Sequence, residues 1–406
     1  MLLHWLWLAT KNGMSDRKKM AILQCFGDPE DVFYAESYER IDGLTVDELA
    51  LLQDKSLGDA KRILAQCTDQ DIHLLTYSDK EYPTRLKYIA DPPLVLYYKG
   101  RLPDFNDAPV IGVVGTRDAS PYGCSAARRM GYQLVKGGGL LVSGCAKGID
   151  AMAMKGALEA DGTPVGVLGC GVDVVYPASN RWLFAELERR GCLISEYPPE
   201  TPPAKWNFPK RNRIISGMSC GVLVVEAPMR SGALITARQA AEQGRDVFVV
   251  PGNIDVETCA GSNAMLRDGA MAVSTGWDIL SEYQAQYPGK LGPVEAVSEE
   301  ADPEQNVLLV AQEPMVPRKE GRFGKKKSQK IIDKKGSGPY SDVEKRLPPL
   351  TEEEQVIVDQ LKQGQRLTDE VIAGCGLPSG RVLSVLTMLQ VKGVIERLPG
   401  NRLALK

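Results

Sequence analysis

Apolar and polar positions follow different rules in successive parts of the chain. From residue 1 to about 75, apolar residues recur with helical spacing between glycines, as in SDRKKMAILQCFG, DPEDVFYAES and LTVDELALLQ. Ser, Asp or Thr stands near the start of each run, where its side chain can accept a hydrogen bond from a free backbone N–H. The spacing therefore predicts a small helical domain over 1–75.

A second pattern begins after a short connection. Residues 76–106 contain an Asp-Pro-Pro break and the apolar run PLVLYY, which predict a bridging segment with one strand. From residue 107, short runs that are apolar on both faces alternate with helical stretches; these runs are PVIGVVG, LLVSG, TPVGVLG, CLISE, GVLVVEA and DVFVVPG. Strands that are covered by helices on both sides have this composition. The alternation predicts an α/β fold, a Rossmann-like, doubly wound and mostly parallel sheet over 107–290.

The last third of the chain changes again. Residues 291–349 have few apolar positions, and their core RKEGRFGKKKSQKIIDKK carries nine basic and two acidic residues, which predicts a flexible Lys-rich linker. Over 350–406, Thr351 and Glu354 have the spacing of a capping box. Three helical stretches and VIERLPGNRLALK, a hairpin turning at Pro-Gly-Asn, follow it. Helices followed by such a hairpin predict a winged helix.

Composition narrows the functional classes. The 406 residues are 43% hydrophobic and 25% charged, with a net charge of -3, so any affinity for nucleic acid has to come from a local patch. Nine single cysteines and two histidines offer no zinc pattern, which predicts reduced, mostly buried thiols and no metal site. The apolar start MLLHWLWLA has no basic residue before it and is followed by Lys11, so we expect a buried first helix and a cytoplasmic protein.

Small-residue loops follow three of the predicted strands. Ligands of an open parallel sheet bind beyond the carboxyl ends of its strands, where backbone N–H groups and helix N-termini attract anions. The first loop holds Gly115, Thr116 and Arg117; the second holds Ser143, Gly144 and Lys147; the third holds Arg230, Ser231 and Gly232. If the sheet is wound as predicted, the three loops form one anion-binding rim.

A dense group of cations joins this rim. The stretch FPKRNRIISG lies between two predicted strands, and its candidate binding residues are Trp206, Phe208, Lys210, Arg211, Asn212 and Arg213. The prolines of PPETPPAKWNFPKRNR predict a loop that closes into a short helix only at RIISG. Cations beside exposed aromatic rings suit phosphates and unstacked bases, although a solvated charge run would have the same composition.

The predicted sheet domain, 107–290, contains few sequence features that are typical of catalytic sites. It has no histidine, no Gly-x-Ser-x-Gly elbow and no Walker A loop, so we expect neither catalytic residues nor a cofactor. The loop GCGVDVVYP lacks the spacing of a dinucleotide fingerprint, and GGG at 137–139 precedes a strand, so we interpret both as structural. The rim is better suited to binding a polyanion than to transforming it.

Several motifs together resemble one family. GTR, SGCAKGIDAMAMKGAL, LGCGVDVVYPASN, ISEYPPETPP, NFPKRNRIISGMSCGVLVVEA, SGALITARQAAEQGR, VFVVPG and GSNAMLRDGA stand in the order found in the bacterial DNA-processing protein A family, also called DprA or Smf. The resemblance covers roughly 107–280. The helical front, which would be SAM-like or helix-hairpin-helix-like, and the winged-helix tail fit the family's three-part layout.

The resemblance implies a function and a set of residues. It implies a homodimer that binds single-stranded DNA, protects incoming DNA during natural transformation and loads the RecA recombinase while displacing single-strand-binding protein. The phosphate-contacting residues it implies are Arg117, Ser143, Gly144, Lys147, Lys210, Arg211, Asn212 and Arg213. Two positions depart from the family pattern: Met154 replaces a usual His, and Glu200 replaces a frequent Gly near the rim.

Two alternative functions stay open on the sequence. A nucleotide phosphoribohydrolase-like enzyme would use a PGGxGT loop and a catalytic Glu, but MRSGALITA lacks both PGG and the following acid. A duplex-DNA regulator would act through its winged helix, where 351–406 holds seven basic and seven acidic residues and the recognition helix offers only Arg381 and Lys392. Strong duplex binding normally neutralises several phosphates, so the tail fits protein contact or auxiliary DNA contact equally well.

Overall fold

The computed structural model describes two units of the chain. It covers residues 1–294 and, in the second unit, 351–362, 364–376, 382, 385, 386, 389, 394–398 and 402–405. The units, Met1–Asp302 and Pro303–Lys406, are described separately. The predicted linker at 291–349 lies outside the described residues except for its first four positions.

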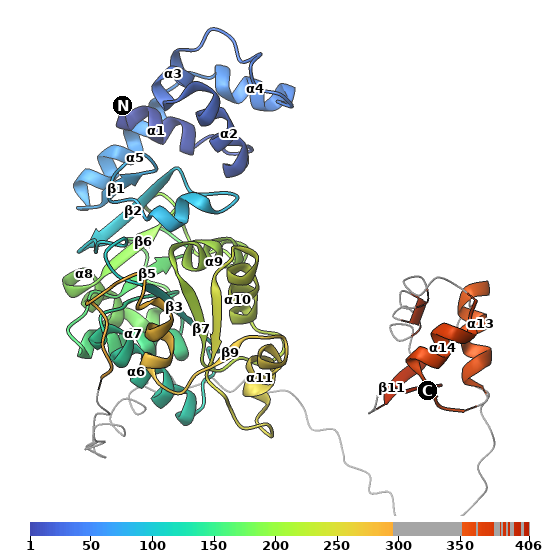
Figure 1. Cartoon of the computed structure of the whole chain (residues 1–406). Coiled ribbons are helices and arrows are strands. Elements are labelled where there is room, and N and C mark those ends of the chain that lie inside the picture. The colour runs from blue at the N-terminus through green and yellow to red at the C-terminus, as the bar shows by residue number, and fades with distance from the viewer. Residues whose placement is uncertain are drawn as a thin grey trace, which may run out of the picture. The chain divides into compact units, whose positions relative to one another are not determined.

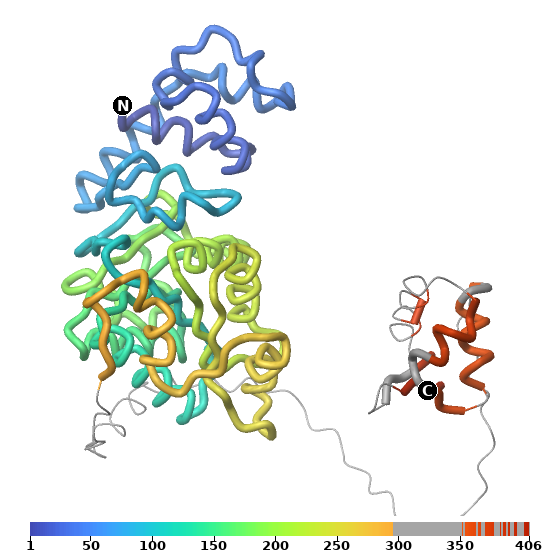
Figure 2. The backbone as a smooth tube through the Cα atoms, in the orientation of Figure 1, coloured from blue at the N-terminus to red at the C-terminus, as the bar shows by residue number. Residues whose placement is uncertain are grey.

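The chain begins with five helices, as the apolar spacing predicts (Figures 1 and 2). These are α1 (Leu2–Ala9), α2 (Asp16–Phe26), α3 (Pro29–Tyr34), α4 (Val46–Gln53) and α5 (Gly58–Asp69). Ser15, Asp28 and Thr45 cap the second, third and fourth helices by accepting backbone N–H bonds. Trp5, Leu6 and Trp7 of the first helix are buried, so the apolar start of the chain is a core helix.

The main sheet confirms the predicted fold class. Its order is β1-β2-β6-β5-β4-β3-β7-β8-β9, and all neighbours from β6 to β9 run parallel. The strands are β1 (His73–Thr76), β2 (Val95–Gly100), β3 (Val110–Val114), β4 (Leu140–Ser143), β5 (Val165–Leu168), β6 (Cys192–Ser195), β7 (Gly221–Val224), β8 (Asp246–Val249) and β9 (Met271–Ala272). The six predicted apolar runs are β3 to β8.

Helices cover both faces of this sheet (Figure 1). One face carries α6 (Pro121–Lys136), α7 (Ile149–Glu159), α8 (Arg181–Arg190) and α12 (Gly276–Leu280), and the other carries α9 (Asn207–Met218) and α10 (Gly232–Glu242). Residues within one strand alternate between two apolar cores: Ile111 and Val113 belong to one, Val110 and Val114 to the other. Burial on both sides is why these strands lack the polar alternation of a half-exposed sheet.

The remaining elements of the first unit are short. They are α11 (Ala260–Arg267) and the 3-10 turns η1 (Thr84–Tyr88), η2 (Ala178–Asn180), η3 (Glu257–Cys259) and η4 (Ser281–Tyr283). The strand predicted from PLVLYY is β2, which pairs antiparallel with β6 and with β1. The sheet therefore starts well before residue 107, because β1 and β2 extend its edge.

The structure corrects one prediction about local structure. The cation-rich stretch is helical from Asn207, because α9 spans Asn207–Met218 rather than starting at RIISG. Pro209 occupies the first turn, where a backbone N–H has no intrahelical partner and where the fixed φ of proline fits a helix. The consequence is positional, since a helix sends residues three apart to the same side.

The second unit has the elements of the predicted winged helix. Its described parts include α13 (Glu352–Leu361), α14 (Thr368–Gly374), β10 (Arg366–Leu367), β11 (Ile395–Leu398) and β12 (Arg402–Leu405), with the antiparallel strand order β10-β12-β11. The capping box of Thr351 and Glu354 is present. Leu398 pairs with Arg402 across the predicted hairpin, while the turn itself, Arg381 and Lys392 lie outside the described residues.

Two predictions from composition can be checked on the fold. All nine cysteines are free, and six of them are buried, as expected for reduced thiols. Burial raises the pKa of the Cys145 thiol, which keeps it protonated. Among the helices of the described residues, none combines the length and the apolar character needed to cross a membrane.

Candidate nucleic-acid interface

A cavity opens where the carboxyl ends of three parallel strands meet the start of α9. Its volume is about 150 Å³, and it is lined by Arg117, Gly144, Ala146, Lys147, Tyr176, Pro177, Phe208 and Arg211. We call it the edge pocket. The loops after β3, β4 and β5 and the first turns of α9 each contribute to its wall, so the fold brings two of the three predicted anion-binding loops together with the cation-rich helix.

Aromatic rings and a guanidinium stack in the edge pocket. The Arg117 guanidinium carbon lies 5.8 Å from the centroid of the Phe208 ring, and the Phe208 and Tyr176 rings are 5.4 Å apart at 32°. Arg117 and Tyr176 are exposed and Phe208 is half-buried, so the stack is accessible from solvent. An exposed cation beside ring faces can bind a phosphate and a base of the same nucleotide.

Arg211 forms the inner wall of the edge pocket. The residue is 5% exposed, and its guanidinium donates to the carbonyl oxygens of Gly144, at 2.8 Å, and of Val167. Burial lowers the pKa of Arg211, and the nearby Asp150 partly offsets this effect. An arginine stays charged under such conditions, so the wall is positive.

Glycine at position 144 leaves room for the Arg211 guanidinium. A Cβ there would lie 2.6 Å from the Arg211 guanidinium. The amide of Gly144 donates to Asp150 at 3.2 Å and that of Ala146 at 3.3 Å, which fixes the loop that carries Lys147. The exposed Lys147 therefore stands on a backbone held in one conformation.

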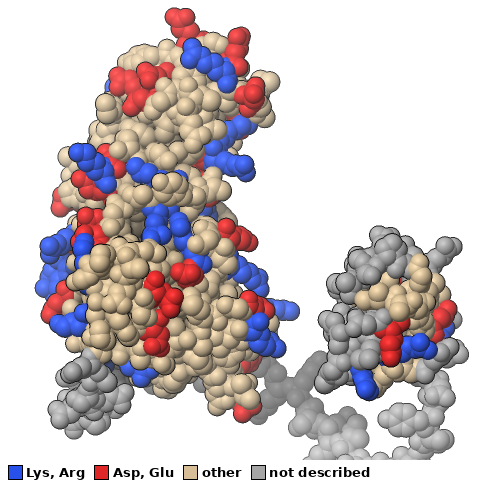
Figure 3. All heavy atoms as spheres, viewed as in Figure 1, with Lys and Arg blue, Asp and Glu red and all other residues tan. Residues whose placement is uncertain are grey.

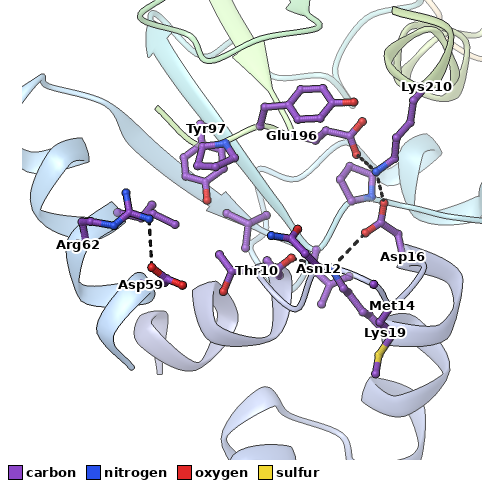
Figure 4. A pocket seen from close by; sticks show the side chains of 18 residues that line it. Thr10, Asn12, Met14, Asp16, Lys19, Asp59, Arg62, Tyr97, Glu196 and Lys210 are labelled. Carbon is purple, nitrogen blue, oxygen red and sulfur yellow. Dashed lines mark hydrogen bonds and ion pairs between the residues drawn. The ribbon is translucent and has the colours of Figure 1, made fainter. Parts of the chain in front are cut away.

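The other cations of α9 face a different cavity. Lys210 lines an opening of about 360 Å³ between the N-terminal helices and the sheet, shown in Figure 4, which we call the seam cavity. Its ammonium nitrogen lies 3.0 Å from a carboxylate oxygen of Asp16 and 3.5 Å from one of Glu196. Lys210 thus pairs with a residue of α2, away from the edge pocket.

Arg213 also takes part in the contact between the N-terminal helices and the sheet, which we call the seam, and it is more deeply buried there than Lys210. Its side chain is 6% exposed, and its guanidinium lies 2.6 Å from Glu196, 2.9 Å from Asp91 and 3.1 Å from Asp16. Three carboxylates from three segments therefore surround one arginine. Neither Arg213 nor Lys210 lines the edge pocket, contrary to the expectation that all cations of this stretch share one rim.

The remaining predicted residues divide in a similar way. Ser143 is fully buried, and its hydroxyl donates to the Val113 carbonyl at 2.6 Å. Thr116 is 7% exposed, and its hydroxyl accepts from the Asp118 amide at 3.3 Å. A Cβ on the adjacent Gly115 would lie 2.4 Å from Ile149. These three residues shape the loops from beneath and do not line the pocket.

The third loop, which holds Arg230, Ser231 and Gly232, does not line the edge pocket. Arg230 and Gly232 are exposed, and Ser231 caps α10 by accepting from the Ala233 amide at 3.2 Å. The Asn212 side chain reaches the Gly232 carbonyl at 3.5 Å, which links α9 to this loop. Trp206, next to the start of α9, is 78% exposed.

The structure adds residues that the sequence interpretation missed. Tyr176 and Pro177 line the edge pocket, although they belong to the loop GCGVDVVYP that was interpreted as structural. The available signal was position, since this loop follows β5 at the ligand edge and carries the aromatic Tyr176 just before its final proline. Testing it only for dinucleotide spacing hid that signal.

Both departures from the family pattern have a definite place. Met154 is buried, and its sulfur lies 3.7 Å from the Cys145 sulfur, so it packs in the core behind the loop of Gly144. Glu200 accepts a hydrogen bond from Gln66 of α5 at 2.8 Å. Its carboxylate therefore faces the N-terminal helices and is absent from the lining of the edge pocket.

Acidic groups in the described part of the chain do not gather as metal ligands. Within these residues there is no group of three or more His, Cys, Asp or Glu side chains placed to hold a metal ion. Glu226 is fully buried at the end of β7, where it accepts from the Ser120 amide at 3.0 Å, from the Ser120 hydroxyl at 3.1 Å and from the Thr258 hydroxyl. Lysine and arginine side chains, in contrast, gather in a hollow near β6 and the start of α9 (Figure 3).

Comparisons with known proteins agree with this architecture. Residues 73–284 match the family described as DNA recombination-mediator protein A, and residues 343–401 match the DprA winged helix domain. DNA processing protein DprA of Bacillus subtilis is 42% identical over 221 residues, which cover 54% of this chain and 74% of that protein. Protein Smf of Synechocystis is 35% identical over 346 residues, or 84% of this chain and 82% of that protein.

A solved structure extends the match to three dimensions. The X-ray structure of DNA processing protein A from Streptococcus pneumoniae aligns with a TM-score of 0.60 and 33% identity, covering 70% of this chain and 98% of that one. The first family match spans more than half of the 406 residues and includes every loop of the edge pocket. The chain therefore belongs to the DNA recombination-mediator protein A family, DprA.

Proposed function

We propose that this chain binds single-stranded DNA in the edge pocket and serves as a recombination mediator rather than as an enzyme. The observation that carries the proposal is the stack of Arg117 on Phe208 and Tyr176 beside the positive wall of Arg211. Only a strand whose bases are not paired can place a base against these rings. Duplex DNA would offer phosphates alone to a pocket of this size.

The proposal assigns the predicted residues unequally. Arg117 and Lys147 would contact phosphate, Phe208 and Tyr176 would stack on bases, and Arg211 and Gly144 would shape the wall. Nucleotides that flank the pocket would be contacted by Trp206, Asn212, Arg230, Ser231 and Gly232. Lys210 and Arg213 would instead hold α9 against the N-terminal helices, and Ser143, Gly115 and Thr116 would act through the loops they support.

The burial of Glu226 and its hydrogen bonds support a non-enzymatic role. The phosphoribohydrolase alternative needs an accessible glutamate, and Glu226 is fully buried with both carboxylate oxygens engaged. A general acid or base has to come within hydrogen-bond reach of its substrate. The enzyme alternative would be supported if the full chain released free base from a nucleotide and Glu226→Gln abolished this release.

The family assignment supports a finer proposal about partners. We infer that the chain forms a homodimer, loads a RecA-type recombinase onto the bound strand and displaces single-strand-binding protein. Light scattering of the full chain tests the dimer. Recombinase filament formation on strands precoated with single-strand-binding protein tests loading, and it should require both the full chain and an intact edge pocket.

The binding experiment compares single and double strands across salt. The full chain should bind single strands more tightly than duplexes of the same length, with an affinity that falls as salt rises. Arg117→Ala should weaken single-strand binding about tenfold, while Arg129→Ala, an exposed arginine on α6, should leave it unchanged. Equal affinities of the parent and Arg117→Ala would overturn the proposal, and binding retained by 345–406 alone would favour the duplex regulator.

A further inference from the structure

An exposed aromatic residue and a cation stand at the start of α8, beside the edge pocket. Of the five tryptophans only Trp182 and Trp206 are exposed, with Trp182 at 43%. Arg181 is exposed as well, and no acidic side chain among the described residues forms an ion pair with it. The accessible part of Trp182 offers a flat aromatic surface on which another ring can stack.

The backbone holds this pair close to the pocket. Tyr176 and Pro177 line the edge pocket, and η2 then leads directly into α8. The side-chain amide of Asn180 donates to the carbonyls of Cys145, at 2.9 Å, and Ala146, at 3.0 Å, and Ala146 is itself a lining residue. The first turn of α8 is therefore fixed to the pocket wall by two hydrogen bonds.

The amphipathic pattern of α8 keeps the pair on the surface. Leu183, Phe184 and Leu187 are buried against the sheet, which leaves Arg181, Trp182 and Ala185 on the outer side. The first turn contains no acidic residue. Farther along, Glu186 pairs with Arg189 and Arg190 at 2.9 Å and 2.8 Å, so the nearest acid of the helix is already neutralised.

We propose that the first turn of α8 is a second nucleotide subsite for single-stranded nucleic acid. A strand leaving the edge pocket past Tyr176 stacks a base on Trp182 and places a phosphate at Arg181. This inference rests on the proposed binding of single strands in the edge pocket and extends its path. The subsite is tolerant of sequence, because every base offers a ring face to tryptophan.

The charges around the edge pocket favour a path of the strand toward α8. On the opposite flank of α9, Lys210 and Arg213 are paired with Asp16, Glu196 and Asp91, so their charges are unavailable to a phosphate. At α8, the exposed Arg181 adds to the exposed cations Lys147 and Arg117, none of which forms an ion pair with a residue that the structure describes. A polyanion gains more by following the unpaired cations.

The test uses two lengths of oligothymidylate. A strand of about four nucleotides fills the edge pocket only, whereas one of about fifteen reaches α8. Trp182→Ala should weaken binding of the long strand about tenfold and leave the short strand unchanged, because it removes the ring on which one base of the long strand stacks. Trp182→Phe should keep most of the affinity, and Arg181→Ala should lower the salt slope by about 0.7 for the long strand alone.

A matched control and a direct readout complete the design. Tyr88→Ala removes an aromatic ring that is 80% exposed on η1, and it should change neither affinity. In a Trp206→Phe background Trp182 is the exposed tryptophan that remains, so the tryptophan fluorescence should be quenched by the long strand and not by the short one, and this quenching should be lost when Trp182→Phe is added.

The outcomes separate the subsite from the underlying function. If Phe208→Ala weakens both strands while Trp182→Ala binds both like the parent, the subsite is wrong and the pocket stands. An equal loss for both strands in Trp182→Ala also overturns the subsite, since it would mean that Trp182 supports the pocket itself. If Phe208→Ala binds both strands like the parent, the proposed function fails first.

Discussion

The two sides of α9 each carry an arginine, and the two arginines have different roles. Phe208 and Arg211, three residues apart, face the edge pocket, whereas Lys210 and Arg213, also three apart, face the seam with the N-terminal helices. In the sequence these four residues look like one cluster. The helical repeat divides them into a pair that we propose binds DNA and a pair that joins two parts of the fold.

The environments explain the division. Arg213 is almost fully buried among three carboxylates, and a buried charge of this kind is stable only while its partners remain. Arg117, in contrast, is exposed, lies over the Phe208 ring and forms no ion pair with any described residue. A cation with few internal partners is the one that can gain from a phosphate.

The largest expected effect concerns the seam. Arg213→Met leaves Asp16, Asp91 and Glu196 without their shared counter-charge, and it should lower the free energy of unfolding by about 3–5 kcal/mol. Denaturant unfolding followed by circular dichroism measures this. Lys210→Met is the matched control and should cost less than about 1 kcal/mol, because the Lys210 side chain is 48% exposed. Similar unfolding curves for the two variants would contradict the prediction that the buried Arg213 stabilises the fold more than the exposed Lys210.

The next effect concerns the pocket side. Phe208→Ala removes the ring that contacts both Arg117 and Tyr176, and it should weaken single-strand binding by about 1–3 kcal/mol with little change in secondary structure. Fluorescence anisotropy with a labelled strand measures the loss, with Tyr34→Ala, a 68% exposed ring on α3, as control. A parent-like affinity of Phe208→Ala would show that the rings do not contact the strand.

A smaller effect should appear in the pH dependence of stability. Burial opposes ionisation of Asp16, but Lys210, Lys19 and Arg213 outweigh it and hold the pKa of Asp16 below its ordinary value. A carboxyl with a lowered folded-state pKa stabilises the fold above its unfolded pKa, and this stability is lost as pH falls through the folded value. Below about pH 4 the parent should therefore lose stability faster than Asp16→Asn. Parallel pH profiles of the two proteins would mean that Asp16 is not ionised in the seam.

The smallest effect is expected at Glu200. The residue has a φ of 64°, a conformation that glycine adopts more easily, and its side chain makes one exposed hydrogen bond to Gln66. Glu200→Gly should therefore change the free energy of unfolding by less than about 0.5 kcal/mol and leave single-strand affinity unchanged. A clear gain in affinity would place the Glu200 carboxylate near the bound strand, against the geometry described above.

Much of the fold could be predicted from the apolar pattern. The runs of β3 to β8 are bounded by small residues and apolar on both faces, and the caps at Ser15 and Thr45 follow from local chemistry. The strands β1 and β9 were missed, because four and two residues carry too little periodicity to be recognised. Their pairing depends on neighbours that are distant in sequence.

The candidate site was predicted in outline only. The loops of Arg117 and Lys147 were expected at the correct edge because parallel strands end together. The orientation of α9 could not be predicted, since a proline in the first turn was interpreted as a helix breaker. The ion pairs of Arg213 with Asp16 and Asp91 join residues that are far apart in the chain, so they cannot be predicted from a local sequence pattern.

The different roles of the edge pocket and the seam cavity can be tested most directly with two identical substitutions. Lys147→Met and Lys210→Met each remove one exposed ammonium group, the first from the edge pocket and the second from the seam cavity. Single-strand affinity is measured across salt for both variants and the parent. We expect Lys147→Met to bind several-fold more weakly, with a salt slope reduced by about 0.7, and Lys210→Met to match the parent. The reverse pattern, with Lys210→Met losing affinity and slope while Lys147→Met keeps both, would contradict this account.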